Sequence, residues 1–407
     1  MSIVRRSVLM ALSAFGVLPR YANAADEVAR LRAVPHSEPM RQLAAGGPSG
    51  LLGIGASGVL WALSLAGEAP RRLGEGLDAA TPIAVGHGRI AARRSDGALW
   101  LLEGGVVRSS ATRSLAPQAG LLILPLAVIA TAAAPGGHRL LRLEPDASQT
   151  WAEVARSPEA VLPDGRPLQV DLDGRSDGGH LAVLAGPDAQ RYTHGVLGDA
   201  IEATRVLWLE RHSLQVRREL SIAAPFVLED LRLRPVTSAA GRTGLLSVRS
   251  GPEGAQLVLI EADAAMPQRL TLAALGEPLG SRNRWLAPTS DGQRWLAVHT
   301  PHIGGVLHEY RRDGERLVAT RIAADVSNHR IGSRELDLGV WRGRWLVLPD
   351  QQGRRLRLFD SGNAWREAAP LVLPAGVAAS VALDEPRSLA LLQGDGRAML
   401  VTLLAPR

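Results

Sequence analysis

Histidines gather in one part of the sequence, between residues 299 and 329. His299 and His302 flank a Thr-Pro pair, and His308 follows in the next apolar run. In a hairpin, His299 and His308 lie on paired strands and His302 lies near the connecting loop. Because imidazole nitrogens commonly bind zinc and other transition metals, the spacing predicts a divalent metal site at these three residues. The alternative is a set of structural histidines, which are commoner than ligands.

A polar insertion from 190 to 204 interrupts two strand-like segments and contains Tyr192, His194 and Asp199. Loops that break a repeat often carry function, because the sheets around them are occupied with packing. The sequence therefore predicts a ligand-binding loop at these three residues. The alternative is a surface loop without a function.

Other patterns resemble known sites but lack parts that those sites need. Residues 53–58, GIGASG, match a dinucleotide fingerprint, yet a strand-like run follows them where the fingerprint needs a helix. Asp171, Asp173 and Asp177 suggest calcium, but the EF-hand acid at the fifth position and the terminal Glu are missing. Both patterns are better interpreted as turns. The chain has no lysine, which excludes Walker-type phosphate loops and Schiff-base enzymes.

Short hairpins must position these residues. In GRIAARRSDGALWLLE, Asp96 and Gly97 separate two strand-like runs, and Asp-Gly supplies the positive φ of a tight turn. The pattern recurs about eight times along the chain. Hairpins are expected over 51–65, 89–103, 127–144, 180–210, 243–261, 293–312, 344–360 and 387–403.

Segments between the hairpins supply an inner and an outer strand, and four strands per unit form the blade of a β-propeller. Residues 46–407 are therefore predicted to form an all-β propeller of seven or eight four-stranded blades. Trp61 and Trp100 follow the turn glycines of matching units and are expected to pack between blades. The last unit lacks a fourth strand. We expect residues 25–45 to form a lead-in that supplies the strand closing the ring.

Two repeats, ASGVLWALSLAGE (56–68) and SDGALWLLEGG (95–105), resemble those of quinoprotein-type propellers. TSDGQRWLAV (289–298) resembles the Pro-Asp-Gly strand of TolB-like and WD-type blades. The resemblance implies the architecture of secreted β-propeller repeat proteins and identifies no specific family. The cysteine pair and haem motif of quinoprotein dehydrogenases have no counterpart, because the chain has no cysteine.

Residues 1–24 read as an export signal peptide, with a basic start, an apolar middle and the small-residue cleavage site Ala22-Asn23-Ala24. Arg5-Arg6 before Ser7 resembles a twin-arginine leader, with the general secretory route as the alternative. We expect a soluble periplasmic protein with no membrane anchor after cleavage.

The formal net charge is +6, but arginine pairs are scattered among acids, so nucleic acid is not an expected partner. Regular repeats without a complete catalytic motif favour an exported binding or scaffold protein with a protein or glycan partner. The alternative is a periplasmic metal-dependent enzyme, a lactonase-like or hydrolytic propeller. No motif in the sequence requires a cofactor. The sequence leaves the cofactor unknown, and a divalent metal is the candidate.

Overall fold

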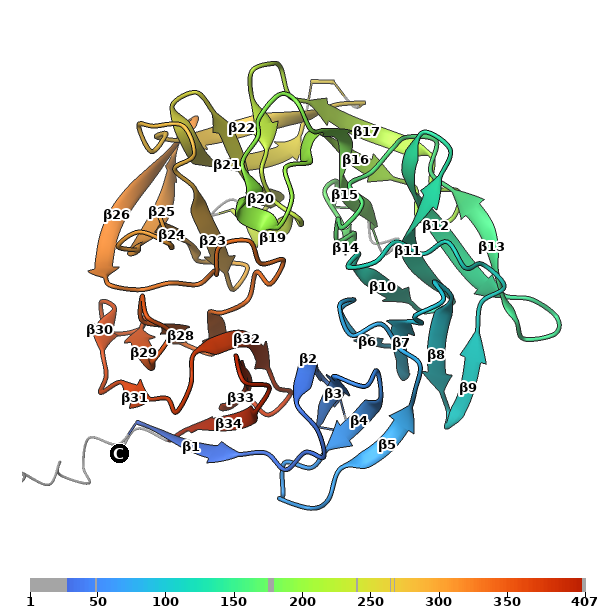
Figure 1. Ribbon diagram of the computed structural model, residues 1–407. Coiled ribbons are helices and arrows are strands. Elements are labelled where there is room, and N and C mark those ends of the chain that lie inside the picture. The colour runs from blue at the N-terminus through green and yellow to red at the C-terminus, as the bar shows by residue number, and fades with distance from the viewer. Residues whose placement is uncertain are drawn as a thin grey trace, which may run out of the picture.

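The computed structural model describes residues 28–47, 50–174, 179–238, 241–263, 265–266 and 268–404. The expected signal peptide, residues 1–24, lies outside these ranges, as does Asp177 of the aspartate-rich turn. Short antiparallel strands make up most of the described chain and stand side by side in a ring (Figure 1). A 3₁₀ helix, η2 (Gly195–Leu197), lies in the polar insertion. In these ranges, no helix has the length and apolar character to span a membrane.

Antiparallel pairing groups the strands into successive units, numbered here from the first complete one. The first four units contain β2 (Met40–Ala45), β3 (Leu51–Gly55), β4 (Leu60–Leu63) and β5 (Arg71–Gly74); β6 (Ala84–Gly86), β7 (Arg89–Arg93), β8 (Leu99–Glu103) and β9 (Val106–Ser109); β10 (Leu121–Leu124), β11 (Ala127–Ala134), β12 (Gly137–Pro145) and β13 (Trp151–Arg156); and β14 (Leu168–Val170), β15 (His180–Asp188), β16 (Glu202–Leu209) and β17 (Val216–Ser221).

The other four units contain β19 (Arg234–Thr237), β20 (Thr243–Gly251), β21 (Gly254–Ala262) and β22 (Leu270–Gly276); β23 (Leu286–Ser290), β24 (Trp295–His299), β25 (Val306–Asp313) and β26 (Arg316–Ala324); β27 (Val340–Arg342), β28 (Trp345–Pro349), β29 (Arg355–Asp360), β30 (Arg366–Glu367) and β31 (Leu371–Val372); and β32 (Val377–Ala382), β33 (Ser388–Gln393), β34 (Ala398–Leu403) and β1 (Ala29–Ala33). Short β18 (Val227–Leu228) bridges β16 and β20.

Each expected hairpin is present as the second and third strands of a unit. Turn chemistry explains this agreement. At the Asp96-Gly97 turn, Gly97 has φ +84°, and a Cβ there would lie 2.1 Å from the carbonyl oxygen of Arg113. Only glycine fits such a turn without strain. The GIGASG motif likewise forms a strand and turn, from β3 toward β4, rather than a strand-to-helix junction.

Apolar clusters fill the space between neighbouring units and form the core of the ring. Trp100, 1% exposed, lies in such a cluster with Leu52 and Leu60 of the preceding unit. A Cβ at Gly74 would lie 2.5 Å from the Trp100 ring, so glycine makes room for the indole. The expected packing of this tryptophan between units is confirmed. Trp61 is half-buried, and its Nε1 donates a hydrogen bond to Glu38.

The N-terminal strand closes the ring, as expected. β1 pairs antiparallel with β34 and becomes the outer strand of the last unit, which removes an open sheet edge. Figure 1 shows the blue β1 beside the red β34. After β1 the chain passes to β2, the innermost strand of the first unit, which pairs with β3.

Turns in an antiparallel unit alternate between the two faces of the ring. Connections from the second to the third strand therefore share a face with the connections between units. We call this face the loop face, and three of its segments matter here: 189–201, 300–305 and 325–339. The turn between the first and second strands of each unit lies on the opposite face.

Candidate functional site

One connection on the loop face extends into the middle of the ring. The segment 325–339 leaves β26 and runs toward β19 before the chain enters β27 (Figure 1). The amide of Gly332 donates a hydrogen bond to the carbonyl of Val196, 2.9 Å away, in the polar insertion. At its other end, the amide of Ser380 donates to the carbonyl of Asp337 at 2.9 Å. The segment is thus held by units on both sides of the ring.

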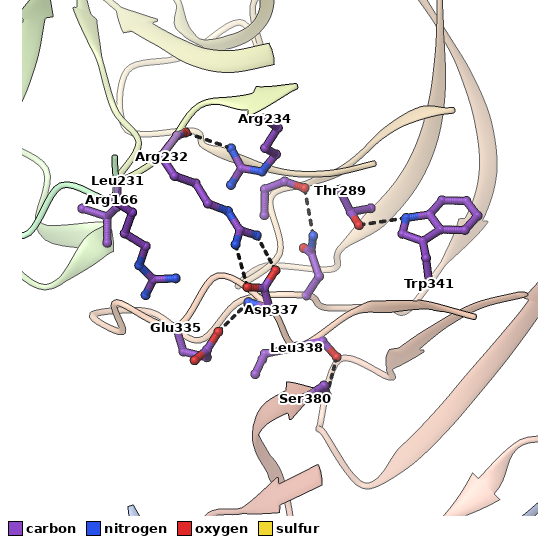
Figure 2. Close-up of polar contacts among 12 residues, drawn as sticks. Arg166, Leu231, Arg232, Arg234, Thr289, Glu335, Asp337, Leu338, Trp341 and Ser380 are labelled. Carbon is purple, nitrogen blue, oxygen red and sulfur yellow. Dashed lines mark hydrogen bonds and ion pairs between the residues drawn. The ribbon is translucent and has the colours of Figure 1, made fainter. Parts of the chain in front are cut away.

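Ion pairs hold the same segment. Arg334 donates from Nε to Asp164 and from Nη2 to Asp199, each at 2.6 Å. Arg232 forms a two-point pair with Asp337 in the centre of the ring, and its Nη1 lies 2.8 Å from Oδ2 (Figure 2). These pairs join positions that are far apart in the chain.

Below the segment lies a channel cavity of about 730 Å³, lined by first strands of several units, including Gln42, Pro235, Thr289, Trp341 and Ser380. Because the cavity admits water, the Arg232 and Asp337 side chains keep 27% and 38% of their exposure. Burial would raise the pKa of Asp337, but Arg232 outweighs burial and holds that pKa below its usual value. The pair therefore stays ionised.

Two nearby groups, Arg234 and Glu335, differ from this ion pair because burial shifts their pKa values toward the neutral forms. Arg234 is 6% exposed, and its Nη1 donates to Asp230 Oδ2 at 2.6 Å. Burial lowers the pKa of Arg234, and Asp230 opposes that effect. Glu335 accepts a hydrogen bond from the amide of Asp337 at 2.8 Å. Burial, and then the charge of Asp337, raise the pKa of Glu335.

The predicted ligand loop is part of this framework. Tyr192 is fully buried, and its hydroxyl accepts a hydrogen bond from the amide of Asn283 at 2.9 Å. His194 Nδ1 is hydrogen-bonded to Glu229, a buried carboxyl that also accepts from Ser250. Asp199 pairs with Arg334, as described above. The structure places all three residues in contacts between segments, and a ligand at this loop stays a prediction.

The buried acids beside this loop have perturbed titration. Glu202, 2% exposed, has a pKa well above its usual value, because burial and then the charge of Glu229 disfavour its carboxylate. Burial also raises the pKa of Glu229, against the effect of the His194 hydrogen bond. Carboxyls with raised pKa values occur at functional sites and in structural networks alike.

The histidines of the predicted metal site form two separate pairs. His299 stacks on His308 with ring centroids 3.8 Å apart, and its Nε2 lies 2.6 Å from the Tyr310 hydroxyl. His302 Nε2 lies 2.9 Å from Nδ1 of His329. The expectation that His299, His302 and His308 surround one ion does not match this geometry.

Local backbone explains the separation. Thr300 has φ +45°, and its amide donates to the carbonyl of Trp285 at 2.9 Å. This contact draws the turn toward Trp285, where the His302 ring lies parallel to the indole at a centroid distance of 6.0 Å. Across the ranges given above, no three His, Asp or Glu side chains are arranged to hold a metal ion.

Residues that the sequence analysis missed contribute most to the central network: Arg166, Arg232, Arg234, Arg334, Glu335 and Asp337. For all of these except Arg166, the sequence carries one signal: they lie in two charged clusters, EDLRLR at 229–234 and RELD at 334–337, beside the innermost strands β19 and β27. Opposite charges in such positions can meet in the middle of a closed ring.

No protein-family model matches the sequence, and no curated protein matches it either. Solved structures do resemble it. BamB from Moraxella catarrhalis aligns with a TM-score of 0.56 and 14% identity, over 92% of this chain and 98% of that one. Sqt1 from Saccharomyces cerevisiae aligns with a TM-score of 0.57 and 11% identity, over 91% and 98%. Both are β-propeller repeat proteins, and at this identity the likeness shows the fold alone. The chain is therefore an all-β propeller repeat protein.

Proposed function

We propose that this propeller is a scaffold that binds a protein partner on its loop face. The observation that carries the proposal is a pair of exposed aliphatic side chains, Ile303 and Ile331, which are 66% and 71% exposed. Ile303 directly follows His302, and Ile331 lies two positions after His329. Because these histidines are hydrogen-bonded to each other, the two isoleucines belong to the same part of the loop face.

The surface beneath the isoleucines is suited to a preformed binding site. A cavity of about 560 Å³ opens there, lined by residues that include His302, His329 and Ile331. The ion pairs of Arg334 and the hydrogen bonds of 325–339 hold the segment in place, so little conformational freedom is lost on binding. Apolar anchors beside a pocket are the usual centre of a protein interface, whereas a glycan offers them little complementary surface.

The proposal includes export to the periplasm, which the sequence of residues 1–24 supports. A folded scaffold without cysteine needs no disulfide there. The partner is accordingly a periplasmic protein with an exposed apolar patch.

The test is capture of the partner from an extract of the cells that produce the protein. The double variant Ile303→Asp/Ile331→Asp should lose the partner, because charges at the centre of an interface oppose desolvation. The matched control is Leu126→Asp/Val106→Asp, at side chains that are 72% and 51% exposed and lie beside turns on the opposite face of the ring. It should recover as much partner as wild type. Equal recovery by both double variants would contradict the proposal, with thermal unfolding used to verify that each is folded.

A further inference from the structure

Arginines converge where the centre of the ring meets the loop face. A cavity of about 310 Å³ lies there, and we call it the mouth cavity. Its lining includes Arg41, Arg166, Arg330 and Arg334, with Glu335 as the one carboxyl among the described residues that line it. The mouth cavity shares Arg166 and Glu335 with the channel cavity.

These arginines come from three separate parts of the chain. Arg41 is in β2 of the first unit, Arg166 precedes β14, and Arg330 and Arg334 lie on the segment 325–339. Bringing four guanidinium groups around one small cavity costs electrostatic free energy unless negative charge is nearby.

Internal contacts neutralise only part of this charge. Arg334 is paired with Asp164 and Asp199. The side chains of Arg41 and Arg330 are exposed, and in the described part of the chain neither guanidinium makes a hydrogen bond or an ion pair. Their donors are therefore available to a ligand.

Arg166 is held in position between the two cavities. One terminal nitrogen, Nη2, donates to the backbone carbonyl of Arg334, and the buried Nε has no hydrogen-bond partner among the described residues. Figure 2 shows its guanidinium beside Glu335 and near the Arg232–Asp337 pair. Arg232 and Arg234 beside it also have a buried Nε without a partner among the described residues, so the centre of the ring holds several donors that no internal acceptor satisfies.

We propose that the mouth cavity binds a small anion with two or more oxyanion groups, a phosphate ester or a polycarboxylate. Arginine suits this chemistry because its planar fork of N–H donors matches two oxygens of a carboxylate or phosphate at once. Gln42 and Gln118 also line the cavity and add neutral amide groups that can complete the ligand's hydrogen bonds. The volume of about 310 Å³ is at the small end of the range for ligand pockets.

The negative charge of Glu335 does not prevent anion binding. Burial raises the pKa of Glu335, and the charge of Asp337 adds to that effect, so the carboxyl gives up its charge more readily than an exposed glutamate. A bound anion would favour the neutral form further. The mouth cavity adjoins the partner surface, because Arg330 precedes Ile331 and also lines the cavity beneath it, but isolated protein is enough to test anion binding.

The test is isothermal titration of the purified full chain with inorganic pyrophosphate and, separately, with citrate, in 150 mM NaCl. The variant Arg41→Gln/Arg330→Gln should bind about tenfold more weakly or worse, because hydrogen bonds from charged donors are lost. The control Arg311→Gln/Arg316→Gln removes two exposed arginines from β25 and β26, the third and fourth strands of their unit, and should bind like wild type.

Binding of pyrophosphate alone, or of citrate alone, supports the site and identifies its chemistry as phosphate or carboxylate. Binding of both anions supports a site that recognises negative charge and does not distinguish phosphate from carboxylate. The proposal is overturned if neither anion binds wild-type protein, or if the mouth variant and the control bind equally well.

Discussion

His329 shows how the fold can use both nitrogens of a buried imidazole. It is 1% exposed, and its Nε2 lies 2.8 Å from the backbone carbonyl of Ser333, which can only accept a hydrogen bond. Nε2 therefore carries the proton, and Nδ1 of the neutral ring accepts from His302 Nε2. Both ring nitrogens are used by the fold, because Nε2 carries the proton and the lone pair of Nδ1 accepts from His302, so no lone pair is left for a metal.

This arrangement makes stability depend on pH. Burial lowers the pKa of His329 to about 3, whereas an unfolded imidazole titrates near 6.5. Between these values the unfolded chain binds the proton and the folded chain does not, so stability falls as pH falls below about 6.5. The contribution is about 1.4 kcal/mol per pH unit in the lower part of that window.

We predict that His329→Gln, which keeps one acceptor and one donor, is less sensitive to acid than wild type. Urea unfolding at pH 7 and pH 5 should show a smaller drop in the free energy of unfolding for the variant. The raised pKa values of Glu202 and Glu229 give the opposite trend, with stability falling as pH rises, and they are present in both proteins. An identical drop in both proteins would show that His329 is already protonated in the fold.

At the scale of elements, the segment 325–339 depends on Arg334. Its partner Asp164 is 3% exposed, and burial raises the pKa of that carboxyl against the effect of Arg334. Removing the arginine leaves a buried carboxyl without its cation, which costs about 3 kcal/mol.

We predict that Arg334→Gln releases the segment from the ring. Limited proteolysis should show new cleavage within 325–339, because a loop must leave its contacts to enter a protease. The control is Arg355→Gln, which also removes the partner of a buried aspartate, Asp350, but leaves the segment's ties intact. Cleavage at the same rate in both variants would show that Arg334 does not hold the segment.

Ring closure is also a property of one element. The amide of Leu404 donates to the carbonyl of Val28, and the amide of Val34 donates to Ala398, so hydrogen bonds tie both ends of β1 to the last unit. Val34 is 1% exposed. A chain lacking residues 28–34 loses this buried side chain and exposes the edge of β34.

We predict that this deletion lowers the free energy of unfolding by about 3 kcal/mol or more. It should also promote self-association, because an open edge can pair with another chain. Thermal unfolding and light scattering measure the two effects. Arg32→Ser, at an exposed position of the same strand, should change neither. Unchanged stability after the deletion would mean that the ring does not need β1.

For the whole molecule, the sequence predicted the architecture well because its signals are local. Asp96 and Gly97 specify their turn without help from the rest of the chain, and alternating apolar residues identify the strands beside it. The repeat then places the strands in units, and the missing outer strand of the last unit points to the N-terminus.

The centre of the ring could not be predicted in the same way. Arg232 and Asp337 meet only because the chain closes on itself, and Arg41 and Arg166 reach one cavity from different units. The histidines near residue 300 were predicted to converge because their spacing fits a hairpin. The positive φ of Thr300, which turns His302 toward Trp285, leaves no mark in the sequence.

Photocrosslinking in the producing cells tests whether a protein partner binds the loop face. A photoreactive amino acid is placed at Ile331 in one strain and at Leu126, on the opposite face, in another. We predict a discrete crosslinked product of higher mass from position 331 and none from position 126. A product of the same mass from both positions, or from position 126 alone, would contradict the assignment of the partner to the loop face.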